Sequence, residues 1–127
     1  MKKILVVEDS ATNIYLIDYA LSHAGYEIIK AETGEAGVEL ALKERPDLIL
    51  MDILLPGIDG LEATRRIRRS EAGKDIPIVA LTANAMTGDR ERALAAGCTG
   101  YLEKPVNPDT IIQEIEAFLP RPQVEKP

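Results

Sequence analysis

The chain has 127 residues, which is the size of one domain with a single buried core. Its 21 acidic and 15 basic residues give a formal net charge of −6, which argues against a nucleic-acid-binding face or an anionic membrane as the main partner. The single cysteine, Cys98, excludes an intrachain disulfide and a cysteine-based zinc site. The sequence has no signal peptide and no run of roughly 20 apolar residues. We therefore expect a cytoplasmic protein, and Met1 favours a natural amino terminus.

Strand-like and helix-like segments alternate through the first part of the chain. The segments predicted there are strand 3–9, helix 13–25, strand 26–31 and helix 33–46. Gly25 is expected to cap the end of the first helix, because glycine is favoured just past a helix C-terminus. Thr33 suits the start of the second helix, and Pro46 must lie beyond its end.

The same alternation continues to residue 119. The segments predicted there are strand 47–52, helix 60–73, strand 76–83, helix 84–97, strand 99–104 and helix 109–119. Thr87 and Gly88 interrupt the fourth helix, and a glycine inside a helix costs about 1 kcal/mol relative to alanine. Residues 120–127 contain three prolines and no apolar period, so we expect a flexible tail or linker stub after a domain spanning 1–119.

Five strand-then-helix units predict an α/β fold. Strand runs that are apolar throughout, rather than alternating, indicate burial on both faces, as in a parallel sheet covered by helices on both sides. The expected fold is a doubly wound five-stranded parallel sheet with right-handed crossovers. Ligands in such sheets bind at the carboxyl ends of the strands.

Polar side chains stand at four of these strand ends. They are Glu8 and Asp9, Asp52, Thr82, and Lys104. Carboxylates that lie close together repel each other and raise each other's pKa unless a cation joins them. An all-oxygen loop site suits Mg²⁺, which keeps several waters and often shares a phosphate oxygen. The acids therefore predict a metal, and the metal together with Lys104 predicts an anion.

Four stretches also give the chain a family resemblance. They are "VVED" (6–9), "LILMDILLPGIDG" (48–60), "ALTANAM" (80–86) and "YLEKP" (101–105). In this order and spacing they resemble the receiver domain of two-component response regulators, over residues 3–119. The "TANAMTGD" stretch (82–89) looks particularly like single-domain relay regulators of the cell-division type or receivers of hybrid histidine kinases. The resemblance implies the chemotaxis-regulator-like fold, with strand order 2-1-3-4-5.

The resemblance also implies a role for each residue of the site. Asp52 corresponds to the phospho-acceptor. Glu8, Asp9, Asp52 and the backbone carbonyl of Leu54 correspond to the ligands of Mg²⁺. The hydroxyl of Thr82 and the ammonium of Lys104 would then each contact a phosphoryl oxygen.

A conformational switch is implied as well. Tyr101 matches an aromatic residue that turns inward when Thr82 moves toward the phosphate, and Pro105 matches a position where the preceding bond is commonly cis. The switching surface would comprise helix 84–97, strand 99–102 and helix 109–119. Leu54 and Asn84 match two residues that orient the attacking water for hydrolysis in relatives. Because the apolar side chain of Leu54 cannot orient a water, we predict slow self-dephosphorylation.

The function expected from this resemblance is a Mg²⁺-dependent receiver that takes a phosphoryl group from a phosphohistidine onto Asp52. It would catalyse its own phosphorylation and dephosphorylation but act on no separate substrate. The phosphodonor would be a histidine kinase or phosphotransfer protein, and a downstream protein would read the switch. Dimerisation through the last two helices, weak or phosphorylation-dependent, is left open.

The sequence is compatible with other functions. An interaction module that works without phosphorylation is one alternative, and a receiver cut from a larger hybrid kinase or DNA-binding regulator is another. A phosphatase of the haloacid dehalogenase type needs a second aspartate two residues after the nucleophile, and neither Asp9 nor Asp52 has one. Neither glycine-rich nucleotide fingerprint is present. The basic run "RRIRR" (65–69) is interpreted as a solvated helix face.

Overall fold

The structure is a computed structural model that describes residues 2–83 and 88–119. Its strands are β1 (Lys3–Val7), β2 (Glu27–Ala31), β3 (Leu48–Asp52), β4 (Ile78–Thr82) and β5 (Gly100–Glu103). Its α-helices are α1 (Ala11–His23), α2 (Gly34–Glu44), α3 (Gly60–Arg69), α4 (Asp89–Ala96) and α5 (Ile111–Glu116). The expected tail (120–127) and the expected first turn of the fourth helix (84–87) lie outside the described residues, so the boundary at 119 stays a prediction.

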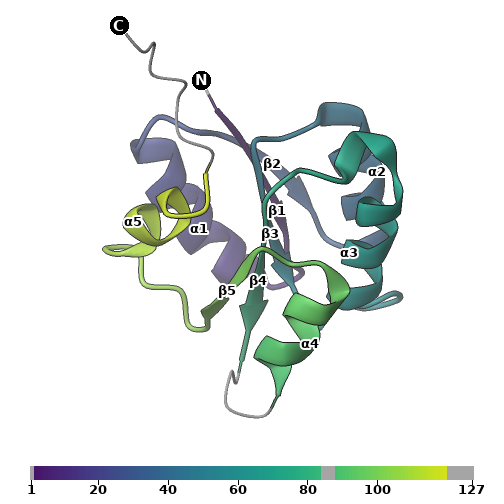
Figure 1. Ribbon diagram of the computed structural model, residues 1–127. Coiled ribbons are helices and arrows are strands. Elements are labelled where there is room, and N and C mark those ends of the chain that lie inside the picture. Colours follow the sequence, from purple (N-terminus) through teal and green to yellow (C-terminus); the bar gives the residue numbers. More distant parts are fainter. Residues whose placement is uncertain (1, 84–87, 120–127) are drawn as a thin grey trace, which may run out of the picture.

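The strands form one parallel sheet in the order β2-β1-β3-β4-β5, which confirms the expected fold. Alternate residues of a strand face opposite sides of the sheet. In β1, Ile4 and Val6 belong to one hydrophobic core and Leu5 and Val7 to the other. Helices α1 and α5 cover the first face, and α2, α3 and α4 cover the second (Figure 1). The sheet is therefore the middle layer of three.

Side-chain caps set the starts of the first two helices. The Ser10 hydroxyl accepts a hydrogen bond from the backbone N–H of Asn13, so α1 begins two residues earlier than expected. It ends at His23, and Gly25 follows with φ of +93°. The predicted cap at Thr33 is confirmed, because its hydroxyl accepts a hydrogen bond from the Ala36 N–H at 3.1 Å.

The third and the last predicted helices are clearly shorter than expected. The segment 60–73 is helical only to Arg69, because Ser70 is extended (φ −91°, ψ 140°) and a 3-10 turn, Glu71–Gly73, follows. A Cβ at Gly73 would lie 2.5 Å from the carbonyl oxygen of Ile67, so the turn folds closely back onto α3. In the last segment, the helix is confined to α5, Ile111–Glu116.

The glycine expected inside the fourth helix lies at its boundary. Gly88 is the N-cap of α4 and has φ of +88°, a conformation that favours glycine, so it carries no mid-helix cost. The buried residues of α4 are Ala93 and Ala96, while Leu94 is 44% exposed. Because small side chains bury little apolar area, packing contributes little to holding this helix on the sheet.

In the part of the chain that the structure describes, each helix falls short of the length and apolar character that crossing a membrane would require.

Candidate functional site

Strand pairing places the predicted site residues at one edge of the sheet. Val7 is opposite Met51, so Glu8 and Asp9 leave β1 beside the end of β3, where Asp52 stands. Asp52 is opposite Leu81, the residue before Thr82. The backbone N–H of Lys104 donates to the carbonyl of Thr82 at 2.8 Å, which brings the chain after β5 to the end of β4.

Three carboxylates gather at this edge. Glu8, Asp9 and Asp52 each offer a carboxylate oxygen, and these oxygens all lie within 4.8 Å of one another. Glu8 is fully buried and Asp52 is 3% exposed, whereas Asp9 lies on the surface. The cluster is therefore a half-open site with two acids inside and one at the rim.

The ammonium of Lys104 completes the cluster. Its Nζ lies 2.9 Å from Oδ2 of Asp52 and 3.2 Å from Oε1 of Glu8. The Lys104 side chain is only 20% exposed, so these pairs are less screened by water than surface pairs. One ammonium among three carboxylates still leaves the cluster strongly negative.

The pKa of Asp52 reflects this imbalance. Burial raises it from 3.8 to about 6, and the nearby Glu8 charge adds to the rise, while the hydrogen bond from Lys104 opposes it. For Lys104, burial acts against the charged form, but the contacts with Asp52 and Glu8 outweigh it and raise its pKa. Without a further cation, the ionised form of Asp52 is therefore disfavoured at this site.

The donor set fits a hard divalent cation. Oε1 of Glu8 is buried, and although the Lys104 ammonium is near, no group meets it in hydrogen-bonding geometry among the described residues. Oxygens from carboxylates on loops are the ligands that Mg²⁺ takes while keeping several waters. The acidic cluster formed by Glu8, Asp9 and Asp52 could therefore bind such an ion.

Backbone packing holds Asp52 in place. Its Oδ1 accepts a hydrogen bond from the N–H of Leu54 at 3.1 Å, and Gly60 donates to the carbonyl of Ile53 at 2.8 Å. A Cβ at Gly60 would lie 2.0 Å from the carbonyl oxygen of Asp52, so only glycine allows α3 to begin so close to the site. The side chain of Leu54 is 72% exposed at the rim.

Thr82 lies at the end of β4, as expected, with its side chain turned toward α4. The residue is 1% exposed, and its hydroxyl donates to Oδ2 of Asp89 at 2.9 Å. Sequence reasoning did not single out Asp89. Its position just after Gly88 indicates only an acidic residue at the start of a helix, where a negative charge is favoured, and does not indicate a contact with Thr82.

Tyr101 is partly buried against the core on the α2–α3–α4 face of the sheet. The guanidinium carbon of Arg90 lies 5.6 Å from the centroid of its ring, within cation–π range. Arg90 was not predicted either, because no local pattern links the two residues. The Lys104–Pro105 peptide bond is cis.

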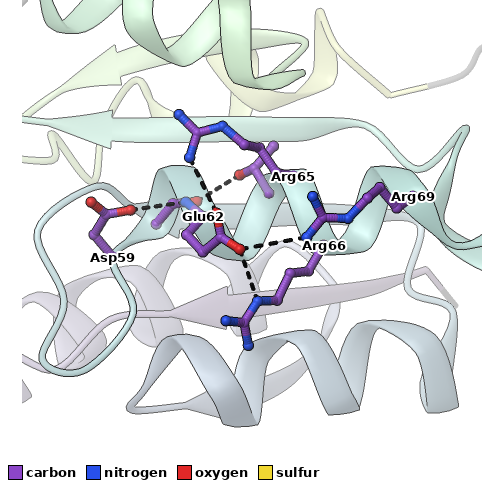
Figure 2. Close-up of polar contacts among 7 residues, drawn as sticks. Asp59, Glu62, Arg65, Arg66 and Arg69 are labelled. Atoms are coloured by element: carbon purple, nitrogen blue, oxygen red, sulfur yellow. Dashed lines mark hydrogen bonds and ion pairs between the residues drawn. The ribbon is translucent and has the colours of Figure 1, made fainter.

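The basic run 65–69 lies apart from this edge. Figure 2 shows the carboxylate of Glu62 among the side chains of Arg65, Arg66 and Arg69. The distances from the guanidinium nitrogens to the carboxylate oxygens are 3.0–3.5 Å. These three arginines are exposed, as expected for a solvated face. Arg68 departs from that expectation, because its guanidinium donates to three backbone carbonyls of the turn after α3 and to that of Gly97.

Comparison with known proteins gives a consistent result. The family model described as the response regulator receiver domain matches residues 4–116. The polar-differentiation response regulator DivK of Brucella anthropi is 40% identical over 93% of this chain and 96% of its own length.

Solved structures agree with the sequence comparison. The receiver domain of the sensor histidine kinase PA1611 from Pseudomonas aeruginosa, with a magnesium ion coordinated in its active site cleft, is 42% identical, with a TM-score of 0.86 over 92% of this chain and 96% of that one. The chemotaxis response regulator CheY4 of Vibrio cholerae is 33% identical, with a TM-score of 0.89 over 94% of this chain and 99% of that one.

Proposed function

The chain belongs to the response regulator receiver family, and on that premise we propose that Asp52 accepts a phosphoryl group from a phosphohistidine in a Mg²⁺-dependent reaction. The observation that carries the proposal is the pairing of a buried carboxylate with Lys104 at 2.9 Å, beside two further acids. Such a cluster has little value for stability, since it concentrates like charge in a buried place. It suits a site where a metal and an anion bind together.

The reaction needs an ionised nucleophile held in line with phosphorus. An oxygen of Asp52 attacks the phosphorus atom of the donor. A P–O bond forms as the P–N bond to the imidazole breaks, and the ring nitrogen keeps the electron pair and takes up a proton. The hydrogen bond from the Leu54 N–H to Oδ1 of Asp52 orients the carboxylate while Oδ2 faces Lys104.

Phosphoryl transfer mainly requires positioning and neutralisation of charge. Lys104 already lies at the acceptor oxygen, where its ammonium can pair with a phosphoryl oxygen once the acyl phosphate has formed. The ion would be held by Glu8, Asp9 and Asp52, with the carbonyl of Leu54 as a further ligand, and would neutralise the remaining charge on the phosphoryl group. Thr82 would donate to another phosphoryl oxygen after leaving Asp89.

The output is proposed to be a change in the surface formed by α4, β5 and α5. This surface includes Tyr101 and α4, the helix whose Asp89 accepts the hydrogen bond of Thr82. Because the buried residues of α4 are alanines, a small free energy can move this helix. The protein is proposed to be cytoplasmic, with a histidine kinase or phosphotransfer protein as phosphodonor and a downstream protein as the reader of the switch. The similarity to the polar-differentiation response regulator DivK supports a role as a response regulator.

Mass spectrometry tests the proposed acceptor. Wild-type protein and the Asp52→Asn variant are incubated with Mg²⁺ and acetyl phosphate. We expect a gain of about 80 Da, the mass of one HPO₃ group, in the wild type alone. A gain in both proteins would place the acceptor elsewhere, and a gain in neither would favour an interaction module that works without phosphorylation.

A further inference from the structure

The first turn of α4 contacts both residues of the proposed switch. Asp89 accepts a hydrogen bond from the hydroxyl of Thr82, with an oxygen–oxygen distance of 2.9 Å, and the next residue, Arg90, places its guanidinium over the ring of Tyr101. The Asp89 side chain is 17% exposed and Thr82 is buried, so water competes weakly for their hydrogen bond. Two adjacent residues of one helix thus hold a hydroxyl at the end of β4 and an aromatic ring on β5.

A threonine hydroxyl has one proton to donate. When that proton is donated to the carboxylate of Asp89, it is not available to a phosphoryl oxygen on Asp52. Both acceptors are anionic, and charge-assisted hydrogen bonds of this kind are among the stronger ones in proteins. Asp89 and the phosphoryl group therefore compete for the same donor.

We propose that Asp89 and Arg90 form a clasp that holds Thr82 and Tyr101 in the unphosphorylated arrangement and opposes phosphorylation-linked switching. The proposal rests on the proposed function, because it names the competitor that a phosphoryl group must displace. Asp89 acts here as a positioning residue, through Thr82. Phosphorylation would then free α4, because the Thr82 hydroxyl would donate its hydrogen bond to a phosphoryl oxygen instead of to Asp89 in the first turn of the helix.

Two further features suit a clasp that opens. Arg92, one turn along the helix, is ion-paired with the other carboxylate oxygen of Asp89, so Asp89 keeps a cationic partner when Thr82 leaves. Gly88 has no side chain to cap the helix, and the buried residues of α4 are alanines. Among the described residues, the side-chain contacts of the first turn with Thr82 and Tyr101 come from Asp89 and Arg90, so losing them would weaken the attachment of this turn to the sheet.

Affinity for a phosphoryl mimic measures the competition. Wild type, Asp89→Ala and Glu91→Ala are titrated with beryllium trifluoride in excess Mg²⁺. Glu91 is the matched control, because it is an exposed acid in the same helical turn. Removing a competing hydrogen bond to a charged group should tighten binding about three- to tenfold in Asp89→Ala, while Glu91→Ala should stay within about twofold of wild type.

A double-mutant cycle separates the clasp from long-range electrostatics. Thr82→Val has the same shape as the wild-type residue but no proton to donate. If Asp89 acts through Thr82, then Asp89→Ala should not change the affinity of Thr82→Val for the mimic. The same gain in both backgrounds would assign the effect to charge alone and overturn the proposal.

The arrangement of Tyr101 provides a readout without metal or mimic. In protein labelled with 3-fluorotyrosine, the Tyr101 signal in the ¹⁹F NMR spectrum is assigned by its loss in Tyr101→Phe. We expect Asp89→Ala and Arg90→Ala to move this signal toward its position in wild type saturated with mimic and Mg²⁺. A signal that stays at the wild-type position in both variants would contradict the clasp.

The outcomes distinguish the two proposals. If wild type fails to bind the mimic in Mg²⁺, the proposed function fails and the clasp fails with it. If wild type binds but Asp89→Ala and Glu91→Ala bind equally tightly, the clasp is wrong and the phospho-acceptor function stands. If the circular dichroism spectrum shows that Asp89→Ala does not fold, Asp89→Asn replaces it, because asparagine keeps the shape of the side chain and removes its charge. Asp89→Asn should also bind the mimic more tightly than wild type.

Discussion

Replacing Asp52 by asparagine tests whether the buried negative charge of the acidic cluster destabilises the metal-free protein. The amide has nearly the shape of the carboxyl group but does not ionise. Burial raises the pKa of Asp52 from 3.8 to about 6. Because one pKa unit corresponds to about 1.4 kcal/mol, ionising this group in the folded protein costs roughly 3 kcal/mol more than in the unfolded chain. The pKa of about 6 already includes the opposing contacts with Lys104, so we expect a net stabilisation of roughly 2–3 kcal/mol at pH 7.5, the lower end allowing for a weaker hydrogen bond from the amide.

The sign of the pH dependence follows from the direction of the change. The folded protein binds the Asp52 proton more tightly than the unfolded chain, so the protonated form favours folding below pH 3.8, and this advantage is lost as the pH rises to about 6. The free energy of unfolding of Asp52→Asn should therefore exceed that of wild type by an amount that grows between these two values and is constant above them.

Urea unfolding followed by circular dichroism, in EDTA and at a series of pH values, measures the difference. Asp18→Asn is the control with the opposite sign, because the hydrogen bond and ion pair with Lys30 lower the pKa of Asp18. It should lower stability at neutral pH. If Asp52→Asn were less stable than wild type at pH 7.5, or if the difference did not vary with pH, the electrostatic reasoning would be refuted.

Three other predictions concern the same edge of the sheet. A Mg²⁺ concentration one hundred times the Kd of wild type should raise the free energy of unfolding of wild type by about 2.7 kcal/mol. The same concentration should stabilise Asp9→Asn much less, and equal gains of the two proteins in calorimetry would exclude Asp9 as a ligand. Leu54→Asn should shorten the lifetime of the acyl phosphate, measured by loss of the added mass, because an amide at this exposed position can orient a water and the present side chain cannot. Gly60→Ala should destabilise the fold by several kcal/mol in urea unfolding, because its Cβ would lie 2.0 Å from the Asp52 carbonyl oxygen; an unchanged midpoint would show that α3 can shift freely.

Much of the architecture could be predicted from local sequence. Residues 4–7 of β1, 48–51 of β3 and 78–81 of β4 are all apolar, and these three strands are the inner ones of the sheet. Thr33 caps α2 as its position before a helical pattern indicates. The acids that end β1 and β3 also follow from the sequence, because a strand end and a carboxylate can both be read within a few residues.

The helix boundaries show where local reading fails. The segment 60–73 has a continuous helical pattern, yet the chain leaves the helix at Ser70 because Gly73 packs onto the carbonyl of Ile67. Arg68 then fills the space with its guanidinium, where the pattern suggested a solvated side chain. Contacts between residues five to eight positions apart, and the contact of Arg68 with Gly97, decided both outcomes, and helical periodicity carries no information about them.

The sequence by itself determined which chemical groups stand at the strand ends, since that depends on residue type and position alone. Only the tertiary structure decided which of these groups meet. Strand order brings the Nζ of Lys104 to 2.9 Å from Oδ2 of Asp52. The placement of α4 puts Asp89 where it accepts the hydrogen bond of the Thr82 hydroxyl. A donor selects among the acceptors that folding places within about 3 Å of it, and that choice exists only once distant segments have packed.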